Sequence, residues 1–143
     1  MRDVWKLLAI EELETYPAKK EAMTTIPERL RELESAFVSI GSPSADKVAV
    51  QGGGGNDKAL NNIVQRESLF RNYTGVVAFV DRVERGLAVL TEEENEILSR
   101  CFIHPERGAV ERIANARGLD KSTVYRMRDD ALRKFTGAMY GVV

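Results

Sequence analysis

Apolar residues recur at helical spacing along most of the chain, and this pattern predicts an all-α fold. The first helix is expected over residues 2–15, where four apolar positions fall near helical spacing: Val4, Leu7, Leu8 and Leu13. Pro17 disfavours the helical conformation at Tyr16, so this helix is expected to end or bend there.

A second helix is expected after a cap at Thr24 or Thr25, with Pro27 inside its first turn. Its apolar residues alternate steps of four and three, the spacing of a coiled-coil seam: Ile26, Leu30, Leu33, Phe37 and Ile40. A long helix from Asn56 or Asp57 to about Leu90 repeats this spacing at Tyr73, Val76, Val80, Val83, Leu87 and Leu90. These helices are expected to form an antiparallel, coiled-coil-like hairpin, and a homodimer through the same seams is the open alternative.

Residues 41–57 are rich in glycine, serine and proline, which predicts a flexible connection between the two helices. The glycines at 52–55, followed by Lys58, resemble a phosphate-binding loop. Such a loop requires G-x-x-x-x-G-K-[ST] after a strand, whereas Ala59 follows Lys58 and no buried strand precedes the glycines. Nucleotide binding is therefore not expected, and no cofactor is predicted.

At Thr91 the pattern changes, because Thr91 and Glu94 form the signature of a capping box. A new helix is expected to start at Glu92, with its acidic first turn at the positive end of the helix dipole. Its apolar face carries Ile97, Leu98, Cys101 and Phe102. The domain boundary is placed between residues 90 and 91, which gives an N-terminal part, 1–90, and a C-terminal part, 91–143.

Two shorter helices follow, and the turn between them contains glycine, which is a helix-turn-helix pattern. The first is expected over about residues 109–117 with a left-handed cap at Gly118, and Asp120 is expected to cap the second. Ala114 provides a small side chain where the helices approach, and Leu119, Val124 and Met127 are expected to point into their core. The open side of the second helix carries Lys121, Ser122, Thr123, Tyr125 and Arg126, at the end that enters the major groove in this motif.

Arg117 stands where an apolar residue is usual, so its stem is expected to cover the core and its guanidinium to reach solvent or a phosphate. Asp129 and Asp130 come one turn after the candidate base-reading residues, where such a helix leaves the DNA. These acids are expected to limit non-specific phosphate binding or to face a protein partner.

Composition narrows the function classes. The 143 residues carry a net charge of −1, so overall charge gives no support for nucleic-acid binding and any DNA contact must come from local charge. No apolar run is long enough to span a membrane and no signal peptide is recognised, so a cytoplasmic protein is expected. With a single Cys and a single His, a metal site is not expected. Cys101 and His104 are better explained by a helix face and a helix end than by thiol catalysis, and an enzyme is not expected.

The segment "LTEEENEILSRCF…AVERIANARGLDKSTVYRMRDDALRKF" resembles region 4 of the sigma-70 family of RNA polymerase factors. The shared features are the L-T-x-x-E start, E-x-I-A before the turn, S-T-V-x-R after it, and A-L-x-K followed by an apolar residue. The whole chain more loosely resembles phage late-gene transcription regulators of the ArpU and RinA kind. No counterpart of the promoter-opening region 2 is recognisable, so an activator or a partial sigma-like factor is expected rather than a complete sigma factor.

The resemblance implies binding to double-stranded promoter DNA, with contact to RNA polymerase, in a bacterial cell or an infected host cell. By position, bases would be read by Lys121, Ser122, Thr123, Tyr125 and Arg126. The resemblance further implies that phosphates are contacted by Arg112, Arg117, Arg133 and Lys134. Two alternatives remain: a phage DNA-packaging protein of the small-terminase kind, and a helical protein-interaction adaptor.

Overall fold

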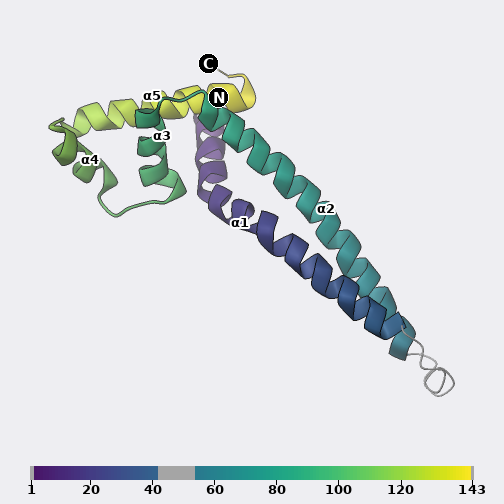
Figure 1. Ribbon diagram of the computed structural model, residues 1–143. Coiled ribbons are helices and arrows are strands. Elements are labelled where there is room, and N and C mark those ends of the chain that lie inside the picture. Colours follow the sequence, from purple (N-terminus) through teal and green to yellow (C-terminus); the bar gives the residue numbers. More distant parts are fainter. Residues whose placement is uncertain (1, 42–53, 143) are drawn as a thin grey trace. The chain divides into compact units, whose positions relative to one another are not determined.

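The computed structural model describes residues 2–41 and 54–142, and the described chain is helical throughout, with turns and no strand (Figure 1). The predicted all-α class is confirmed. The elements are α1 (Arg2–Gly41), α2 (Gly54–Ala88), α3 (Glu92–Leu98), a π-helical turn η1 (Ser99–Ile103), α4 (Ala109–Arg117) and α5 (Lys121–Tyr140). No helix in the described ranges is both long and apolar enough to cross a membrane.

α1 is one continuous helix, so the predicted end at Pro17 and the predicted new start at Thr24 or Thr25 are wrong. A proline inside a helix removes one hydrogen bond and costs about 3 kcal/mol. Leu13, which is fully buried, and Ile26 fix the helix on either side of Pro17. Their burial offsets that cost, since each large apolar side chain contributes about 1.5–3 kcal/mol.

α2 begins two residues before the predicted Asn56 and ends at Ala88, close to the predicted Leu90. The seam residues behave as expected, because all of them are buried or half-buried. Residues 42–53 lie outside the described chain. Most of the predicted flexible connection, and the first glycines of the rejected phosphate loop, fall among them.

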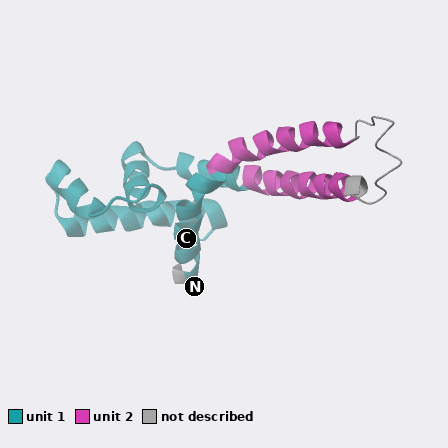
Figure 2. Cartoon of the chain, turned by 90° about the horizontal axis from the view of Figure 1, so that it is seen from below, with its two compact units in different colours: residues 1–19, 79–143 teal, residues 20–78 magenta. Residues whose placement is uncertain are grey.

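The chain divides into two compact units (Figure 2). Unit 1 comprises residues 1–19 and 79–143, and unit 2 comprises residues 20–78. The predicted boundary between 90 and 91 coincides with the end of one helix and the start of the next. The units are grouped differently, since the start of α1 and the end of α2 belong with residues 91–143.

Unit 1 has a core to which α1, α2, η1 and α5 all contribute, together with Leu98 at the end of α3. Its buried members include Leu13 of α1, Val83 of α2, and Leu132 and Phe135 of α5. The ring of Trp5 lies 5.1 Å from that of Tyr140, which adds an aromatic contact between α1 and α5. A second cluster, beneath α4 and the start of α5, contains Ile97, Val110, Ile113, Ala114 and Val124.

Gly86 of α2 lies directly against side chains of α5. A Cβ atom at this position would lie 2.9 Å from the ring of Phe135 and 3.0 Å from the sulfur of Met139. Both distances are shorter than van der Waals contact, so only a glycine leaves room for the ring at this crossing.

In unit 2 the segments of α1 and α2 lie side by side (Figure 2). The buried amide of Asn62 donates a hydrogen bond of 2.7 Å to the carbonyl oxygen of Leu33. The guanidinium of Arg66 lies over the ring of Phe37, 4.7 Å from its centroid. These contacts set Leu33 level with Asn62 along the two helices.

Candidate nucleic-acid interface

The turn between α4 and α5 is built by Gly118 and Asp120. Gly118 ends α4 with φ 65° and ψ 37°, a left-handed conformation that glycine adopts without the cost of a Cβ clash. The backbone N–H of Leu119 donates to the carbonyl oxygen of Ala114 at 2.9 Å, which closes the cap. Asp120 stands at the predicted N-cap position of α5, although its side chain makes no capping hydrogen bond.

The core beneath this turn agrees with the predicted pattern except at Leu119. Ala114 and Val124 are buried between the helices, and Met127 packs against them half-buried. Leu119 is 36% exposed, so the expectation that it points into the core is wrong. The left-handed cap turns the chain away from α4 at this residue, and Val124 fills the space on the inner side instead.

The start of α5 presents a polar, accessible surface. Lys121, Ser122 and Arg126 are exposed, Tyr125 is 41% exposed, and Thr123 is half-buried. The ammonium of Lys121 lies 3.6 Å from the carboxylate of Glu111 on α4. Arg126 makes no ion pair with any residue in the described ranges, so its guanidinium is available to a ligand without breaking an internal contact.

The guanidinium of Arg128 packs against the ring of Tyr125. Its guanidinium carbon lies 4.9 Å from the centroid of Tyr125 and 5.7 Å from that of Phe102 in η1. Its Nε is buried and has no hydrogen-bond acceptor among the described residues. A cation between two ring faces is favourable, and it restricts the orientations open to the exposed tyrosine. The i, i+3 spacing of Tyr125 and Arg128 on one helix could have indicated the first contact, whereas the contact with Phe102 depends on the packing of η1, which is remote in the chain.

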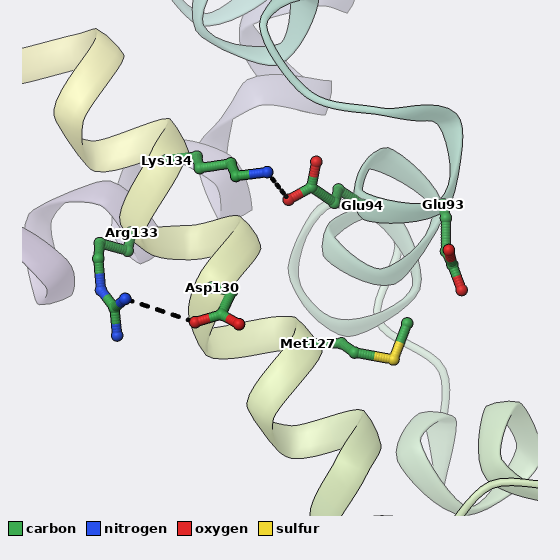
Figure 3. Close-up of a pocket in the computed structure, with 6 residues that line it drawn as sticks. All are labelled: Glu93, Glu94, Met127, Asp130, Arg133 and Lys134. Atoms are coloured by element: carbon green, nitrogen blue, oxygen red, sulfur yellow. Dashed lines mark ion pairs between the residues drawn. The ribbon is translucent and has the colours of Figure 1, made fainter.

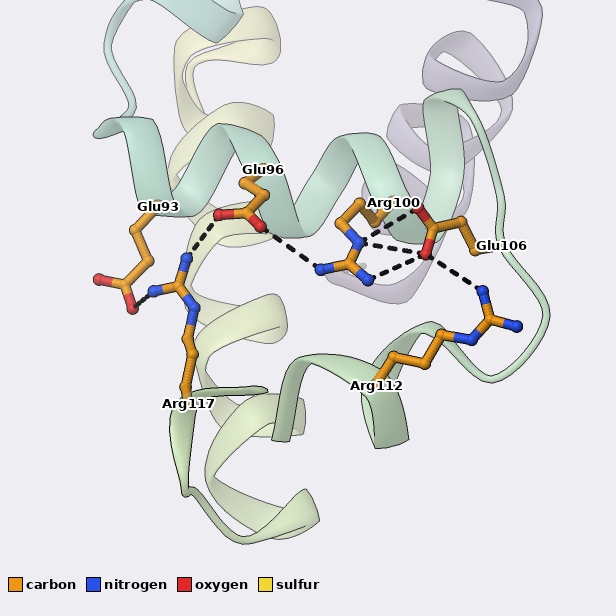
Figure 4. Close-up of polar contacts among 6 residues, drawn as sticks. All are labelled: Glu93, Glu96, Arg100, Glu106, Arg112 and Arg117. Carbon is orange, nitrogen blue, oxygen red and sulfur yellow. Dashed lines mark hydrogen bonds and ion pairs between the residues drawn. The ribbon is translucent and has the colours of Figure 1, made fainter. Parts of the chain in front are cut away.

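The two candidate phosphate contacts on α4 are engaged within the protein (Figure 4). The guanidinium of Arg117 forms ion pairs with Glu93 and Glu96 of α3 rather than extending into solvent as expected. Arg112 lies 4.0 Å from Glu106, whose main partner is Arg100 at 3.0 Å. That Arg100 contact lowers the pKa of Glu106, so the carboxylate stays ionised between the two arginines.

The remaining phosphate candidates lie beside a shallow cleft between α3 and α5 (Figure 3). Lys134 donates to Glu94 at 2.9 Å, and Arg133 lies 3.5 Å from Asp130. The hydrogen bond from Lys134 lowers the pKa of Glu94, and the backbone N–H of Thr91 adds to this effect. The predicted capping box is confirmed, since Thr91 and Glu94 bond each other's backbone N–H groups.

The acids after the exposed segment of α5 have partners inside unit 1. Asp130 pairs with Arg133, and Asp129 lies 3.4 Å from the ammonium of Lys6 in α1. The Lys6 contact joins positions too distant in the chain for sequence reasoning to pair. Arg107, in the loop before α4, is a further exposed cation without an ion partner in the described chain, and no sequence motif marks this position.

Cys101 is a half-buried member of the apolar face of η1, and burial raises the pKa of its thiol. This direction is opposite to the activation that a nucleophilic thiol requires. His104 is exposed at the end of η1. Within residues 2–41 and 54–142, no three His, Cys, Asp or Glu side chains are placed to hold a metal ion.

Comparison with known proteins finds no match to this chain among protein-family models, curated proteins or solved structures.

Proposed function

We propose that this chain is a sequence-specific DNA-binding transcription regulator that reads bases with the first turns of α5. We interpret α3, α4 and α5 as a helix-turn-helix domain of the sigma region 4 kind, and the remaining long helices as a helical hairpin. The observation that carries the proposal is the exposed set Lys121, Ser122, Tyr125 and Arg126, which follows a left-handed glycine turn between two packed helices. An exposed set at the N-terminal end of the second helix is the arrangement that enters a major groove.

Arg126 is the strongest candidate for a base contact. Arginine is the usual partner of guanine in the major groove, where it donates two hydrogen bonds to O6 and N7. Because Arg126 has no ion partner among the described residues, it meets DNA without giving up an internal contact. Tyr125 beside it offers an apolar ring face for a thymine methyl group, in an orientation that Arg128 restricts.

Phosphate binding is expected to be weak. Each of the four candidate cations lies beside a carboxylate with which a phosphate has to compete. The pairs are Arg112 with Glu106, Arg117 with Glu93 and Glu96, Arg133 with Asp130, and Lys134 with Glu94. Affinity at physiological salt should then depend on base contacts and on a partner protein. On the resemblance of the sequence to sigma region 4 and to phage late-gene regulators, we propose action at promoters together with RNA polymerase, as a phage or prophage product in a bacterial cell or an infected host.

The same ion pairs support one alternative, a helical protein-interaction adaptor. In an adaptor the paired cations would stabilise the fold and would have no phosphate to bind. The two functions differ in one measurable property, which is preference for a DNA sequence.

Selection of bound DNA from a random pool by the full-length chain, at low salt, tests the proposal. An enriched sequence is expected, and Arg126→Ala should weaken its binding by about 1–3 kcal/mol and relax preference at one base position. Lys58→Ala, which removes the same charge from an exposed position of α2 in unit 2, is the matched control and should keep the preference. A pool with no enriched sequence, or an unchanged preference in Arg126→Ala, would contradict the proposal.

A further inference from the structure

Unit 2 contains a groove between its α1 and α2 segments, about 550 Å³ in volume. Leu30 and Glu34 of α1 line one side, and the α2 side is lined by Ile63, Arg66, Glu67, Phe70 and Arg71. Phe70 is 63% exposed although it borders the groove. An aromatic side chain left this accessible at a concave surface is typical of a binding site.

Exposed apolar side chains continue along the same face. Val38 follows Glu34 by four residues, Leu60 precedes Ile63 by three, and Val64 follows Leu60 by four, so helical spacing aligns them with the groove. Together with Phe70 these are the large apolar residues that are exposed in the described part of unit 2. The same part buries few apolar residues, namely Ile26, Leu33 and Val76. Two helices with so little buried surface and one apolar outer face resemble half of a four-helix bundle.

The charged residues of the groove lack ion partners. Glu34, Glu67 and Arg71 form no ion pair with any residue that the structure describes. Arg66 lies over the ring of Phe37, and its buried Nε has no hydrogen-bond partner among the described residues. An interface that excludes water requires opposite charges in register, because an unpaired buried charge is costly. The groove carries both signs itself, and this is the requirement for pairing with an identical surface.

The positions of these charges fit a two-fold axis. Glu34 is about level with Asn62, since the neighbouring Leu33 is bonded to Asn62. Arg71 lies roughly 13 Å farther along α2, at about 1.5 Å per residue. A two-fold axis that lies in the interface and crosses the groove midway between them, between Arg66 and Glu67, brings Glu34 of one copy level with Arg71 of the other.

The same axis matches the apolar residues. Phe70 and Ile63 lie on opposite sides of the midpoint, at similar distances along α2. The two-fold rotation therefore places Phe70 of one copy beside Ile63 of the other copy. In an isologous interface every contact occurs twice, which doubles the contribution of both pairs.

We propose that a second copy of this chain docks in this groove and forms a two-fold symmetric dimer. Phe70 of each copy packs beside Ile63 of the other, and Glu34 of each copy pairs with Arg71 of the other. The inference concerns unit 2 alone and does not depend on DNA binding.

Sedimentation velocity of the full-length chain over a range of concentrations, without DNA, tests the dimer. The wild type should shift from monomer to dimer as concentration rises. Phe70→Glu should raise the dissociation constant roughly 30-fold or more, the effect of losing an interface hot spot. Asn72→Glu adds the same charge at an exposed position of α2 that does not line the groove, and should leave the dimer intact.

Charge reversal tests the proposed pairing. Glu34→Arg and Arg71→Glu should each weaken the dimer, and the double variant should recover most of the wild-type affinity, since both pairs are restored with opposite polarity. Circular dichroism shows whether each variant retains its helices. A wild type that stays monomeric or forms a ring of many subunits, a dimer that survives Phe70→Glu, or a double variant without recovery would overturn the proposal.

Discussion

Gly86 shows how one missing side chain fixes the approach of two helices. Glycine within a helix normally costs about 1 kcal/mol relative to alanine. Its presence in the middle of unit 1 is explained by the Phe135 ring, which occupies the position where a Cβ atom would stand. Gly75, on the same helix, has no such neighbour, because a Cβ atom there would meet nothing within 4 Å.

These two glycines give a matched test of packing at the residue scale. Gly86→Ala should lower the free energy of unfolding by about 1–2 kcal/mol, because overpacking against a buried ring exceeds the gain in helix propensity. Gly75→Ala should raise it by up to about 1 kcal/mol, because only the propensity changes. Urea denaturation measures both, and the explanation fails if Gly86→Ala is as stabilising as Gly75→Ala.

Side-chain partners were predictable from the sequence only where they are close in the chain. The capping box of Thr91 and Glu94 and the left-handed cap at Gly118 follow from local rules. The contacts of Arg117 with Glu93 and of Lys6 with Asp129 depend on how α3, α4, α5 and α1 pack. For this reason the exposed positions of α5 were predicted better than the cations assigned to phosphates.

At the scale of elements, Glu94 in the first turn of α3 both completes the cap of that helix and forms an ion pair with α5. Glu94 accepts from Lys134 and from the backbone of Thr91, and both contacts lower its pKa from the ordinary value of 4.5. A carboxyl group whose pKa is depressed by folding contributes stability above its unfolded pKa, and loses that contribution as the pH falls through its folded pKa. The acid side of the stability profile should therefore depend on this residue.

Glu94→Gln provides the test, because glutamine also completes a capping box but does not titrate. The wild type should lose more of its free energy of unfolding between about pH 7 and pH 3 than Glu94→Gln does. Adding Lys134→Met should shrink that difference, since the main partner of the carboxylate is removed. Urea unfolding at each pH gives the values, and equal pH profiles for the wild type and Glu94→Gln would contradict this account.

Element boundaries were predicted well where a cap stops the helix and poorly where tertiary packing overrides a breaker. Thr91 and Gly118 have local reasons to end or begin a helix. Pro17 also disfavours a helix locally, but α1 continues through it because Leu13 and Ile26 are buried on either side. A single sequence shows the proline and does not show the packing that compensates for it.

At the scale of the whole molecule, unit 1 is discontinuous in sequence. Phe135 and Leu132 of α5 share a core with Leu13 of α1 and Val83 of α2. A chain limited to residues 91–143 would expose these side chains of α5 to water. Because buried apolar surface stabilises the fold by about 25 cal/mol per Å², such a fragment lacks much of its stabilising core.

Two shortened chains test this organisation. Residues 91–143 alone should show reduced helix content and no cooperative thermal transition. A chain in which a short glycine–serine linker joins residue 19 to residue 79 should unfold cooperatively, since Lys19 and Phe79 already lie close together, with the ammonium 6.0 Å from the ring centroid. Circular dichroism during heating distinguishes the two, and a cooperative transition in the 91–143 fragment would contradict the shared core.

The closeness of Lys19 and Phe79 also bears on how the chain reaches its native state. Leu13 leaves the ribosome long before Phe135, so the apolar face at the start of α1 stays exposed until α5 has been synthesised. Closing so long a loop is slow, because its entropic cost grows with the length of free chain. Once the two helical segments within residues 20–78 have paired, however, Val83 lies close to Leu13. The loop that remains to be closed, from Val83 to Phe135, is much shorter. The pairing of residues 20–78 therefore shortens the loop that the core of unit 1 has to close.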